Sequence, residues 1–391
     1  MRSHRQSTVR TNPADVLIAG GGIGGLSLAL ALRRCGSNAV VWERAAELRE
    51  IGAGLLLTPN AVWVLQQLDL LKATGDFGRV VEQWQILDRR GNVLQTFAQK
   101  GGGLPSISIT RSAFQQLLFS KLPSDAVLLD REVVSVSPSG IGERIAVRSA
   151  RGETADADLI VGADGGRSMV RDFIAGAQAP RTLGYVGWRG LVSQLPSGWE
   201  NGRITESWGR GGRFGIAPVS AGRTYWYATE NVPSGWDVPP EKRKAHLLAR
   251  FRDWHSPICE LIEATNDPDI LLSSISEQAA LRSWFRGSVT LLGDAAHLMT
   301  PNLGQGAAMA LEDAWILAEC LRAEICDRDA LKRYERLRKR RASLVVWLSH
   351  QVGRMIQLEN PALAALRDGM LRVTPDWVGA CMLAPVFNFR A

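Results

Sequence analysis

The chain has 391 residues, of which 46% are hydrophobic and 22% are charged. This composition excludes a wholly disordered protein, and 39 glycines without a three-residue period exclude a collagen-like one. The 46 lysines and arginines outnumber the 39 acidic residues, and the resulting net charge of +7 favours anionic partners only weakly.

The N-terminus resembles a signal peptide at first sight, because basic residues precede the uncharged stretch Val16–Leu32. That stretch contains five glycines and leads directly into a second strand-like segment. We therefore interpret residues 1–13 as a loose leader, expect no integral membrane segment, and assign the rest to the fold. The five cysteines are scattered and form no CxxC pair, so we expect no disulfide framework, no metal site and a cytoplasmic location.

The first predicted unit is a strand, a turn, a helix and a strand. Residues 14–19 are a short apolar run, residues 26–34 continue as a helix, and residues 39–43 form the next strand. The turn carries the spacing Gly20-x-Gly22-x-x-Gly25, in which the glycines allow a tight turn, a close approach of a pyrophosphate, and packing of helix on strand. Glu43 ends the second strand, where it would accept hydrogen bonds from an adenosine ribose. Together these features predict dinucleotide binding.

The middle of the chain is predicted to be rich in strands. We expect a hairpin over residues 84–97, a strand over 106–109 followed by a helix over 111–122, and a second hairpin over 144–163. Residues 181–230 combine aromatic and β-branched residues with many glycines, which indicates a strand-dominated insert. A buried strand over 288–292 and a helix over 304–322 follow. The nucleotide-binding segments therefore lie at both ends of the chain, around the insert.

Two C-terminal features allow more than one interpretation. The basic run from Lys332 to Arg341 has Leu331, Tyr334, Leu337 and Leu344 interleaved at helical spacing, so we expect an amphipathic helix with a solvated basic face. Contact with nucleic acid or an anionic membrane is the less favoured alternative. The apolar tail, residues 377–389, is expected to pack against its own core, with a pocket cap, a dimer contact or a membrane contact left open.

Two further motifs place carboxylates at the ends of predicted strands. Asp164 follows the apolar run of residues 158–163, where an α/β sheet binds ligands, although an aspartate capping a turn would look the same. Asp294 follows the strand of residues 289–292 and would bind a polyol hydroxyl. The loop from Pro301 to Gly306 then begins a helix whose N-terminal NH groups would face an anionic ring or phosphate.

In this order, the motifs GGGIGG, GADG and GDAAH with PNLGQG resemble those of the class A flavoprotein monooxygenases, such as salicylate, hydroxybenzoate and urate hydroxylases and zeaxanthin epoxidase. The resemblance implies an α/β fold in which a Rossmann-like FAD-binding domain is interleaved with a strand-rich substrate domain, followed by C-terminal helices. The implied division is 14–80, 100–180 and 280–325 for the FAD domain, 81–99 and 181–279 for the substrate domain, and 326–391 for the helical segment.

The resemblance also implies a reaction. Such an enzyme binds FAD, takes reducing equivalents from NADH or NADPH, and uses dioxygen to hydroxylate or epoxidise an electron-rich aromatic or heteroaromatic small molecule through a flavin hydroperoxide. We expect a pocket rich in Trp and Phe to shield the reacting flavin from water. The expected partners are the substrate and dioxygen, without nucleic acid, and the expected state is a monomer or homodimer.

The cofactor residues that the resemblance implies come from all three motifs. The glycines would hold the pyrophosphate, Glu43 the adenosine ribose and Asp294 the ribityl chain, while Val133 would lie beside the adenine. Arg111 would contact the flavin, and Pro301 through Ala307 would line its ring. The full implied set is Gly20, Gly22, Gly24, Gly25, Glu43, Arg44, Gly54, Arg111, Val133, Asp164, Asp294, Pro301, Gly304, Gly306 and Ala307.

Arg213 and Tyr225 are the candidate catalytic residues, because they match the active-site arginine and tyrosine of urate hydroxylase; ordinary sheet residues are the alternative. Tyr225 and Tyr227 alternate along one strand and share a face. Asn302 stands where urate hydroxylase has an aspartate, so it cannot serve as a base and urate is disfavoured. His297 is expected to support its loop rather than to act on the substrate.

Three alternatives to a monooxygenase remain: a halogenase, a prenyl reductase, and a non-catalytic flavin-binding module. The halogenase signature WxWxIP is absent, since the segments around Trp236 and Trp284 do not match it. The three motifs together argue against a non-catalytic module. The substrate, the atom oxidised and the choice between NADH and NADPH are left open.

Overall fold

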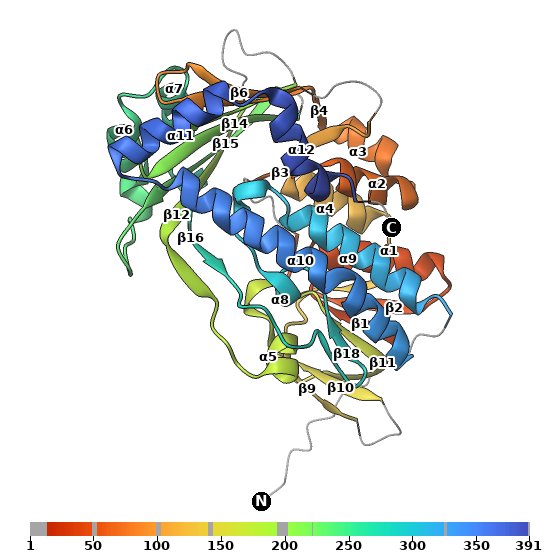
Figure 1. The fold of residues 1–391 in the computed structure, drawn as a ribbon. Helices are drawn as coiled ribbons and strands as arrows, with labels where there is room; N and C mark the ends of the chain where they lie inside the picture. The colour runs from red at the N-terminus through yellow and green to blue at the C-terminus, as the bar shows by residue number, and fades with distance from the viewer. Residues whose placement is uncertain are drawn as a thin grey trace, which may run out of the picture.

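The structure is a computed structural model, and it describes residues 14–48, 53–98, 103–139, 144–193, 202–220, 222–323 and 327–389. The predicted leader, residues 1–13, lies outside the described residues. Three sheets and a layer of C-terminal helices make up the fold (Figure 1). The α/β class, the strand-rich insert and the C-terminal helices predicted from the sequence are confirmed.

The largest sheet has eight strands and contains the predicted N-terminal unit. Its main path runs β17-β18-β11-β1-β2-β8, and β10 joins β11 to β9 as an antiparallel ribbon. The strands are β1 (Ala14–Ala19), β2 (Ala39–Trp42), β8 (Val127–Leu128), β9 (Val133–Pro138), β10 (Ile145–Ser149), β11 (Thr154–Gly162), β17 (Phe285–Arg286) and β18 (Val289–Leu291). Helix α1 (Ile23–Arg34) connects β1 to β2 and packs against α9 (Gly306–Leu321).

Parallel pairing in this sheet brings the three sequence motifs together. β1 lies between β2 and β11, β11 also pairs with β18, and all these pairs are parallel. In the register, Ala19 is opposite Gly162, and Gly162 is opposite Leu291. Because the carboxyl ends of parallel strands meet at one edge, the residues that follow these three positions are neighbours, although they are far apart in the chain.

The second sheet has seven strands in the order β16-β12-β15-β14-β13-β5-β6, of which only the β13–β5 pair is parallel. Its strands are β5 (Gln83–Asp88), β6 (Val93–Ala98), β12 (Arg181–Val192), β13 (Arg203–Trp208), β14 (Gly212–Ser220), β15 (Arg223–Asn231) and β16 (Leu271–Glu277). Helices α6 (Arg243–Phe251) and α7 (Ile258–Ala264), with η2 (Pro240–Lys242) and η3 (Asp267–Asp269), lie beside it.

The tryptophan side chains of the insert belong mostly to the core under α6 and α7, so the cavity holds fewer of them than expected, with Trp188 and Trp84 in its lining. Trp188, Phe214 and Trp226 pack with Leu247 and Phe251 in one buried cluster. The physical reason is the alternation of side chains along a strand, which places these residues on the opposite face from Arg213 and Tyr225. The substrate face is consequently more polar than the sequence suggested.

A three-stranded sheet and three helices join the two larger sheets. Strands β3 (Gly54–Leu57), β7 (Ser106–Thr110) and β4 (Arg79–Val81) pair antiparallel. The helices are α2 (Pro59–Gln67), α3 (Leu71–Phe77) and α4 (Arg111–Ser120), and Thr110 caps α4 by accepting a hydrogen bond from the Ala113 amide. β7 contacts β14 of the second sheet, and β3 contacts α9, which packs on α1 of the first sheet.

The remaining short elements support the motif loops. They are η1 (Gly165–Arg167), α5 (Met169–Ala175), α8 (Asp294–His297) and η4 (Pro301–Leu303). The helix predicted from residue 304 begins at Gly306, because Gly304 adopts a left-handed conformation with φ of 62°. No helix in the described ranges has both the length and the apolar composition needed to cross a bilayer.

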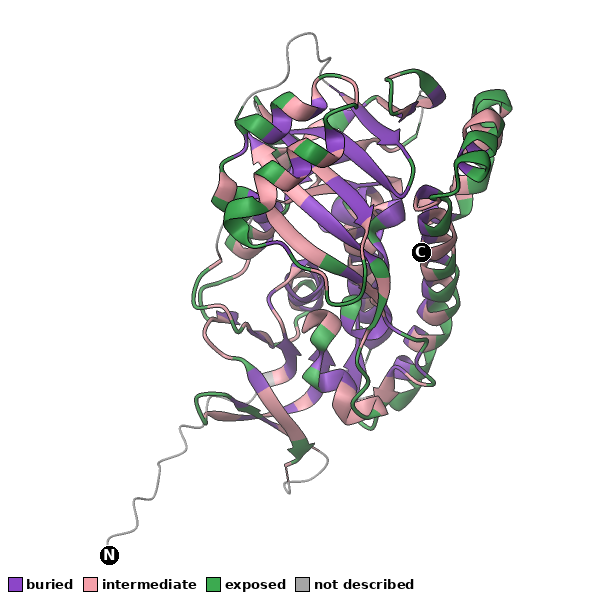
Figure 2. Ribbon diagram, turned by 90° about the vertical axis from the view of Figure 1, so that its left-hand side faces the viewer, coloured by how far each residue is buried: buried purple, intermediate pink, exposed green. Residues whose placement is uncertain are grey.

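Helices α10 (Arg328–Ile356), α11 (Pro361–Val373) and α12 (Asp376–Phe387) lie along one side of the molecule, where their outer surfaces are exposed (Figures 1 and 2). The predicted solvated basic face of α10 is wrong for Arg338, which is fully buried between two carboxylates. The predicted apolar side is wrong for Leu337 and Leu344, which are exposed. The tail packs on its own core through Val386, whereas Trp377 is exposed.

Candidate functional site

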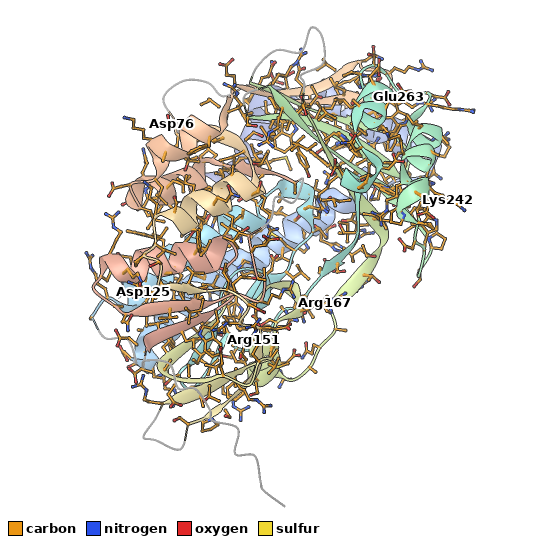
Figure 3. All side chains as sticks on the ribbon, turned by 180° about the vertical axis from the view of Figure 1, so that it is seen from behind. Asp76, Asp125, Arg151, Arg167, Lys242 and Glu263 are labelled. Carbon is orange, nitrogen blue, oxygen red and sulfur yellow. The ribbon has the colours of Figure 1, made fainter. Side chains whose placement is uncertain are left out.

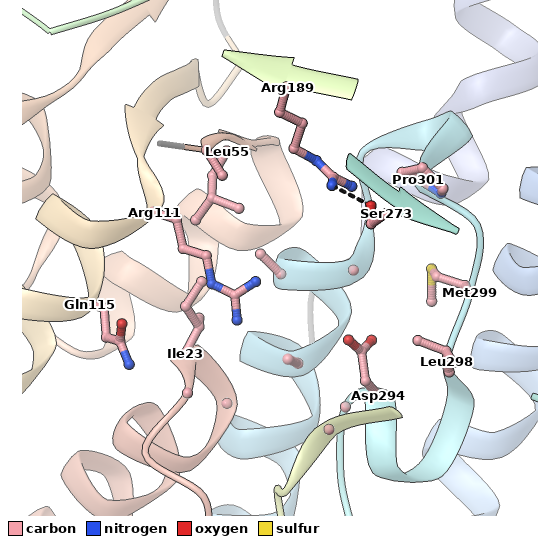
Figure 4. Close-up of a pocket in the computed structure, with 18 of the residues that line it drawn as sticks. Ile23, Leu55, Arg111, Gln115, Arg189, Ser273, Asp294, Leu298, Met299 and Pro301 are labelled. Atoms are coloured by element: carbon pink, nitrogen blue, oxygen red, sulfur yellow. Dashed lines mark hydrogen bonds between the residues drawn. The ribbon is translucent and has the colours of Figure 1, made fainter. Parts of the chain in front are cut away.

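One continuous cavity of about 1150 Å³ extends from the glycine turn of the first sheet to the polar face of the second. Its walls include β1, β2 and β18 at one end and β12 to β16 at the other. Figure 4 shows the middle of this cavity, where side chains from α4, β12, β16 and α8 point into a common space. The cavity therefore joins the predicted cofactor residues to the predicted substrate residues.

The glycine turn forms an open cradle at the N-terminus of α1. A Cβ atom at Gly22 would meet no atom within 4 Å, so the backbone there is open to a ligand. By contrast, a Cβ at Gly25 would lie 2.0 Å from the carbonyl oxygen of Gly20, which makes Gly25 a packing residue. An N-terminal helix turn with free NH groups and a positive dipole attracts phosphate, so this cradle fits a pyrophosphate.

Glu43 holds the glycine turn from the end of β2. Its Oε2 accepts a hydrogen bond from the Gly21 amide at 2.6 Å, and its Oε1 accepts one from the Ala45 amide at 2.8 Å. Glu43 and Arg44 both line the cavity. The carboxylate is thus fixed beside the open cradle, where a ribose attached to a bound pyrophosphate would reach it.

Asp164 lies at the end of β11, next to the glycine turn. Its Oδ2 accepts a hydrogen bond from the Val170 amide at 3.2 Å, while its buried Oδ1 has no hydrogen-bond partner among the described residues. Burial raises the pKa of this carboxyl, and hydrogen bonds from the following turn oppose the rise. Arg171 steadies the turn by donating to the Gly166 carbonyl at 2.8 Å. An unpaired carboxylate oxygen in the cavity wall fits a ligand hydroxyl or amide.

Asp294 and Arg111 point into the same part of the cavity from opposite walls (Figure 4). The surface of Asp294 faces the cavity rather than bulk solvent, and its desolvation raises the pKa of its carboxyl, against the opposing charges of His297 and Arg111. Asp294 is thus a carboxylate with acceptor capacity, facing a cationic side chain across a space large enough for a ligand. That combination fits a polyol chain joined to an anionic ring.

Asp313 of α9 fixes the motif that carries Asp294. Its Oδ2 accepts hydrogen bonds from the Gly293 amide at 2.9 Å and from His297 Nε2 at 2.6 Å. Its Oδ1 accepts one from Arg338 Nε at 2.7 Å. Burial alone would raise the pKa of this carboxyl, but His297 and Arg338 together hold it well below its usual range. His297 therefore has the supporting position that the sequence predicted.

The loop before α9 is held by a side chain that turns away from the cavity. Gln305 Nε2 donates to Thr58 Oγ1 at 2.8 Å, and Asn60 Nδ2 donates to Gln305 Oε1 at 3.0 Å. This buried link to α2 leaves the backbone of the loop facing the cavity, with Gly304 and Gly306 in its wall. A Cβ at Gly306 would meet nothing within 4 Å, as at Gly22.

Sixteen of the seventeen predicted site residues line this one cavity; the exception is Gly25, which packs α1 on the turn. Gly54 has a second role, because a Cβ there would lie 2.4 Å from the ring of Tyr225. The open backbone at Gly22, the unpaired Asp164 oxygen and the facing pair of Arg111 and Asp294 match a dinucleotide with a polyol and an anionic ring. The residues present therefore fit FAD.

At the substrate end, Arg213 is paired with a carboxylate that the sequence analysis did not single out. Its Nη1 contacts both oxygens of Glu206, at 3.1 and 3.2 Å, and both side chains are almost fully buried. Glu206 also accepts hydrogen bonds from the Tyr227 hydroxyl and the Trp208 indole. Burial disfavours the charge of Arg213, yet the Glu206 carboxylate outweighs this and raises the guanidinium pKa.

Arg213 keeps donor capacity despite this pairing. Its Nη2 donates to Asn302 Oδ1 at 3.0 Å, and Asn302 Nδ2 in turn donates to the Tyr185 hydroxyl at 3.1 Å. Its Nε is buried and has no hydrogen-bond partner among the described residues. Asn302 here completes the coordination of Arg213 rather than offering a base. The group at this wall of the cavity is therefore a neutral ion pair whose Nη donors are held by Glu206 and Asn302.

Tyr225 and Tyr227 share the cavity face, as predicted, with ring centroids 5.7 Å apart. Burial raises the pKa of Tyr225, and the neighbouring Arg189 guanidinium opposes the rise. Arg189 of β12 donates to Ser273 Oγ at 2.7 Å (Figure 4), and it forms no ion pair with a carboxylate among the described residues. Arg189 is thus a cavity arginine whose charge, unlike that of Arg213, is not neutralised by a neighbour.

Gln115 and Glu206 also belong to the site, although they are not among the residues predicted from the sequence. Gln115 lies one helical turn after Arg111, lines the cavity, and donates from Nε2 to the Gly21 carbonyl at 2.7 Å. Its spacing from Arg111 on one helix face was a usable signal. Glu206 had no such signal, because only the pairing of β13 with β14 brings it to Arg213.

Comparison with known proteins gives consistent matches over nearly the whole chain. Residues 13–349 match the FAD binding domain family. The chain is 40% identical over 362 residues to the aurachin C monooxygenase/isomerase of Stigmatella aurantiaca, covering 92% of this chain and 94% of that protein. It is 34% identical to the 2-heptyl-3-hydroxy-4(1H)-quinolone synthase of Pseudomonas aeruginosa strain UCBPP-PA14, covering 92% of this chain and 94% of that protein.

A solved structure supports the same assignment. The crystal structure of Klebsiella pneumoniae HpxO complexed with FAD and uric acid superposes with a TM-score of 0.88 at 27% identity, covering 98% of this chain and 97% of that one. The order of the motifs, the cavity that they line and these matches agree. The chain belongs to the FAD binding domain family and, within it, to the FAD-dependent class A flavoprotein monooxygenases.

Proposed function

We propose that this monooxygenase uses NADH or NADPH and dioxygen to oxidise an electron-rich, uncharged heteroaromatic compound of the 4-quinolone type. The observation that carries the proposal is the single cavity that joins the FAD-fitting residues to a polar pocket containing a neutralised arginine. The names of the two relatives, a quinolone synthase and an aurachin C monooxygenase, support the same chemical class.

The charge at the pocket argues for an uncharged substrate. Glu206 already neutralises Arg213, so an anion beside this pair would face a buried carboxylate, while the charge of Arg189 is placed at Tyr225 instead. A neutral ring would instead lie against this neutral pair without bringing a further charge into the buried site. We assign Arg213 and Tyr225 as substrate-contacting residues on this basis.

The protein's own residues orient the reactants and exclude water. The Gly22 cradle, Glu43, Asp164 and Asp294 would hold the cofactor, and Pro301 to Ala307 would lie against its ring. When bound, the reduced flavin supplies the electrons that activate dioxygen for transfer of one oxygen atom. Arg189, close to Tyr225, would stabilise negative charge on a substrate oxygen as the ring is oxidised.

Several finer points belong to the same proposal. We propose that the FAD-binding segments are 14–80, 100–180 and 280–325, because the strands of the second sheet come from residues 83–98 and 181–277. We propose a reducing cytoplasm as the location, because the cysteines among the described residues are all free. A monomer and a homodimer both remain compatible with the proposed reaction.

The test is oxidation of NADH and NADPH by the purified flavoprotein, across a panel of quinolones, indoles, phenols and purines, with peroxide measured in parallel. We expect quinolones to stimulate oxidation most, with little peroxide and a product heavier by one oxygen atom. Compounds of the panel that carry a carboxylate should stimulate NADH or NADPH oxidation least, because the Glu206 carboxylate repels them.

Two outcomes would contradict the proposal. Stimulation only by anionic phenols or purines would contradict the uncharged heteroaromatic class. Oxygen-independent turnover, or turnover that requires a halide, would contradict oxygen insertion and favour a reductase or a halogenase.

A further inference from the structure

Exposed apolar side chains are concentrated on the three C-terminal helices. Of the fourteen large apolar side chains that are exposed in the described residues, ten belong to α10, α11 and α12. On the side of the molecule seen in Figure 3, exposed charged side chains include Asp125, Lys242 and Glu263. We call the exposed surface of α10 to α12 the C-terminal face. A patch of this kind on a monomer marks an interaction site.

Helix α11 presents an almost purely apolar outer stripe. Leu363, Leu366, Met370 and Val373 follow one another at spacings of three or four residues, and their exposed fractions are 50, 60, 60 and 79%. The opposite side of the helix is buried at Ala364 and Arg367 and packs against β6. The apolar stripe is thus a second side of α11, separate from the side that already packs on the core.

Helix α10 adds a stripe that is both apolar and basic. Leu337, Leu344 and Trp347 are exposed at helical spacing, and Arg336 and Arg340 are exposed beside them. The side that packs on α9 is the opposite one. Exposed leucine and tryptophan next to arginine on one helix face are typical of helices that lie in a membrane interface.

The charges of α10 favour an anionic partner over a second copy of the chain. After Asp329, every exposed charged side chain of this helix is basic: Lys332, Arg333, Arg336, Arg340 and Arg354. Two copies of the chain meeting through this face would bring these arginines close to one another, and after Asp329, which pairs with Lys332, the helix offers no exposed carboxylate to compensate. Anionic lipid headgroups would balance the arginines while the acyl region receives the apolar side chains.

We propose that the C-terminal face binds the surface of an anionic lipid bilayer, with the α11 stripe and Trp347 inserted among the lipids and the α10 arginines at the headgroups. This is surface binding and does not require a membrane-spanning helix. It goes beyond the proposed function and does not depend on the identity of the substrate.

The test is co-sedimentation of the purified, FAD-loaded full chain with phosphatidylcholine vesicles that contain or lack phosphatidylglycerol. We expect binding to the vesicles with phosphatidylglycerol, weakening as salt is added. Brominated lipids should quench tryptophan fluorescence, and Trp347→Phe should lose part of that quenching. These measurements report contact of the protein with lipid rather than non-specific adsorption or aggregation.

Matched variants separate the two parts of the face. Leu366→Ser with Met370→Ser should weaken vesicle binding at least about tenfold, because two apolar side chains no longer enter the bilayer. Arg336→Gln with Arg340→Gln should weaken it about 25-fold in total, about fivefold for each charge. Phe77→Ser and Lys72→Gln, exposed residues of α3 that lie outside the face, are the controls and should bind as the unchanged protein does.

All variants change exposed residues, so their thermal unfolding midpoints should stay close to that of the unchanged protein. If the midpoint of the Leu366→Ser, Met370→Ser protein falls strongly, the milder variant Leu366→Thr takes its place in the binding test. The absence of binding to phosphatidylglycerol vesicles, or equal binding by face variants and controls, would overturn the proposal. A dimer that only the face variants abolish would assign the face to a second copy. Duplex DNA binding lost in the arginine variants, without vesicle binding, would assign it to nucleic acid.

Discussion

At the scale of single residues, the cavity carries two carboxylates with opposite functions. Asp294 faces open space in the cavity, and desolvation by its surroundings raises the pKa of its carboxyl. Glu206 faces Arg213 and is satisfied by three donors. The first is positioned to bind a ligand, and the second sets the charge that a ligand meets.

We expect Asp294→Ala to weaken FAD binding about 10- to 100-fold, which corresponds to the loss of hydrogen bonds to a charged acceptor. Fluorescence titration of the FAD-free protein measures this. The same change should not lower the stability of the FAD-free protein at neutral pH. The Asp294 side chain is exposed to the cavity in the FAD-free protein, so alanine removes no buried contact there. A variant that binds FAD unchanged would exclude Asp294 from the cofactor site.

We expect Glu206→Gln to shift substrate preference toward anionic analogues, because it leaves the charge of Arg213 unbalanced in the pocket. The ratio of KM for a neutral quinolone to KM for a carboxylate-bearing one should rise about tenfold. The fold should lose roughly 3 kcal/mol, as expected when one partner of a buried ion pair is removed. Glu230→Gln is the matched control, since Glu230 is a buried glutamate on the other face of the same sheet, bonded to Trp188. An unchanged KM ratio in Glu206→Gln would contradict the role proposed for the pair.

At the scale of secondary-structure elements, the glycine turn separates ligand binding from packing within a few residues. Gly22 has a φ of −73°, which any residue adopts, and its Cβ position is open. Gly25 has no room for a Cβ because the Gly20 carbonyl is 2.0 Å away. The same sequence motif therefore contains residues with different physical requirements.

Gly22→Ala should leave thermal stability nearly unchanged and weaken FAD binding at least about tenfold, because the new methyl group occupies the approach of the pyrophosphate. Gly25→Ala should instead lower the unfolding midpoint of the FAD-free protein, because α1 must move away from the turn. Unfolding scans with and without FAD distinguish these effects. Equal destabilisation by both changes would show that the turn acts as one packing unit.

At the scale of the whole molecule, buried ion pairs connect the C-terminal helices to the FAD-fitting sheet. Arg338 of α10 contacts Glu312 at 2.6 Å and Asp313 at 2.7 Å on α9, and Asp313 holds the turn before Asp294. Arg341 of the same helix also binds Glu312. A displacement of α10 would therefore reach the cofactor site through Asp313.

We expect Asp313→Asn to destabilise the protein by about 3–5 kcal/mol at neutral pH. The folded-state pKa of Asp313 is depressed, so its contribution is complete above about pH 4, the ordinary carboxyl value, and is lost as the pH falls through the folded pKa. The difference in unfolding free energy between the two proteins should shrink steadily below pH 4. Asp125→Asn, an exposed change, is the control, and a pH-independent difference would contradict the linkage.

The sequence by itself determined the family and the interleaved α/β fold, and it predicted a set of cofactor residues that the fold brings to one cavity. These follow from local patterns: glycine spacing, apolar strands and the acids that end them, because a parallel sheet must bring the carboxyl ends of its strands to one edge. Sixteen predicted residues therefore meet at one cavity. The spacing of Gln115, four residues after Arg111 on the same helix face, is a local pattern of the same kind and indicates a cavity position for Gln115 as well.

Only the tertiary structure decided which side of each element is buried and which charges meet. The pairing of β13 with β14 joins Glu206 to Arg213, strand alternation turns Trp226 into the core under α6 and α7, and the packing of α10 on α9 buries Arg338 while exposing Leu337. Each of these outcomes depends on contacts between segments distant in the chain. Local composition cannot specify such contacts, because the same leucine or arginine satisfies a helix pattern whether it faces a carboxylate, a core or solvent.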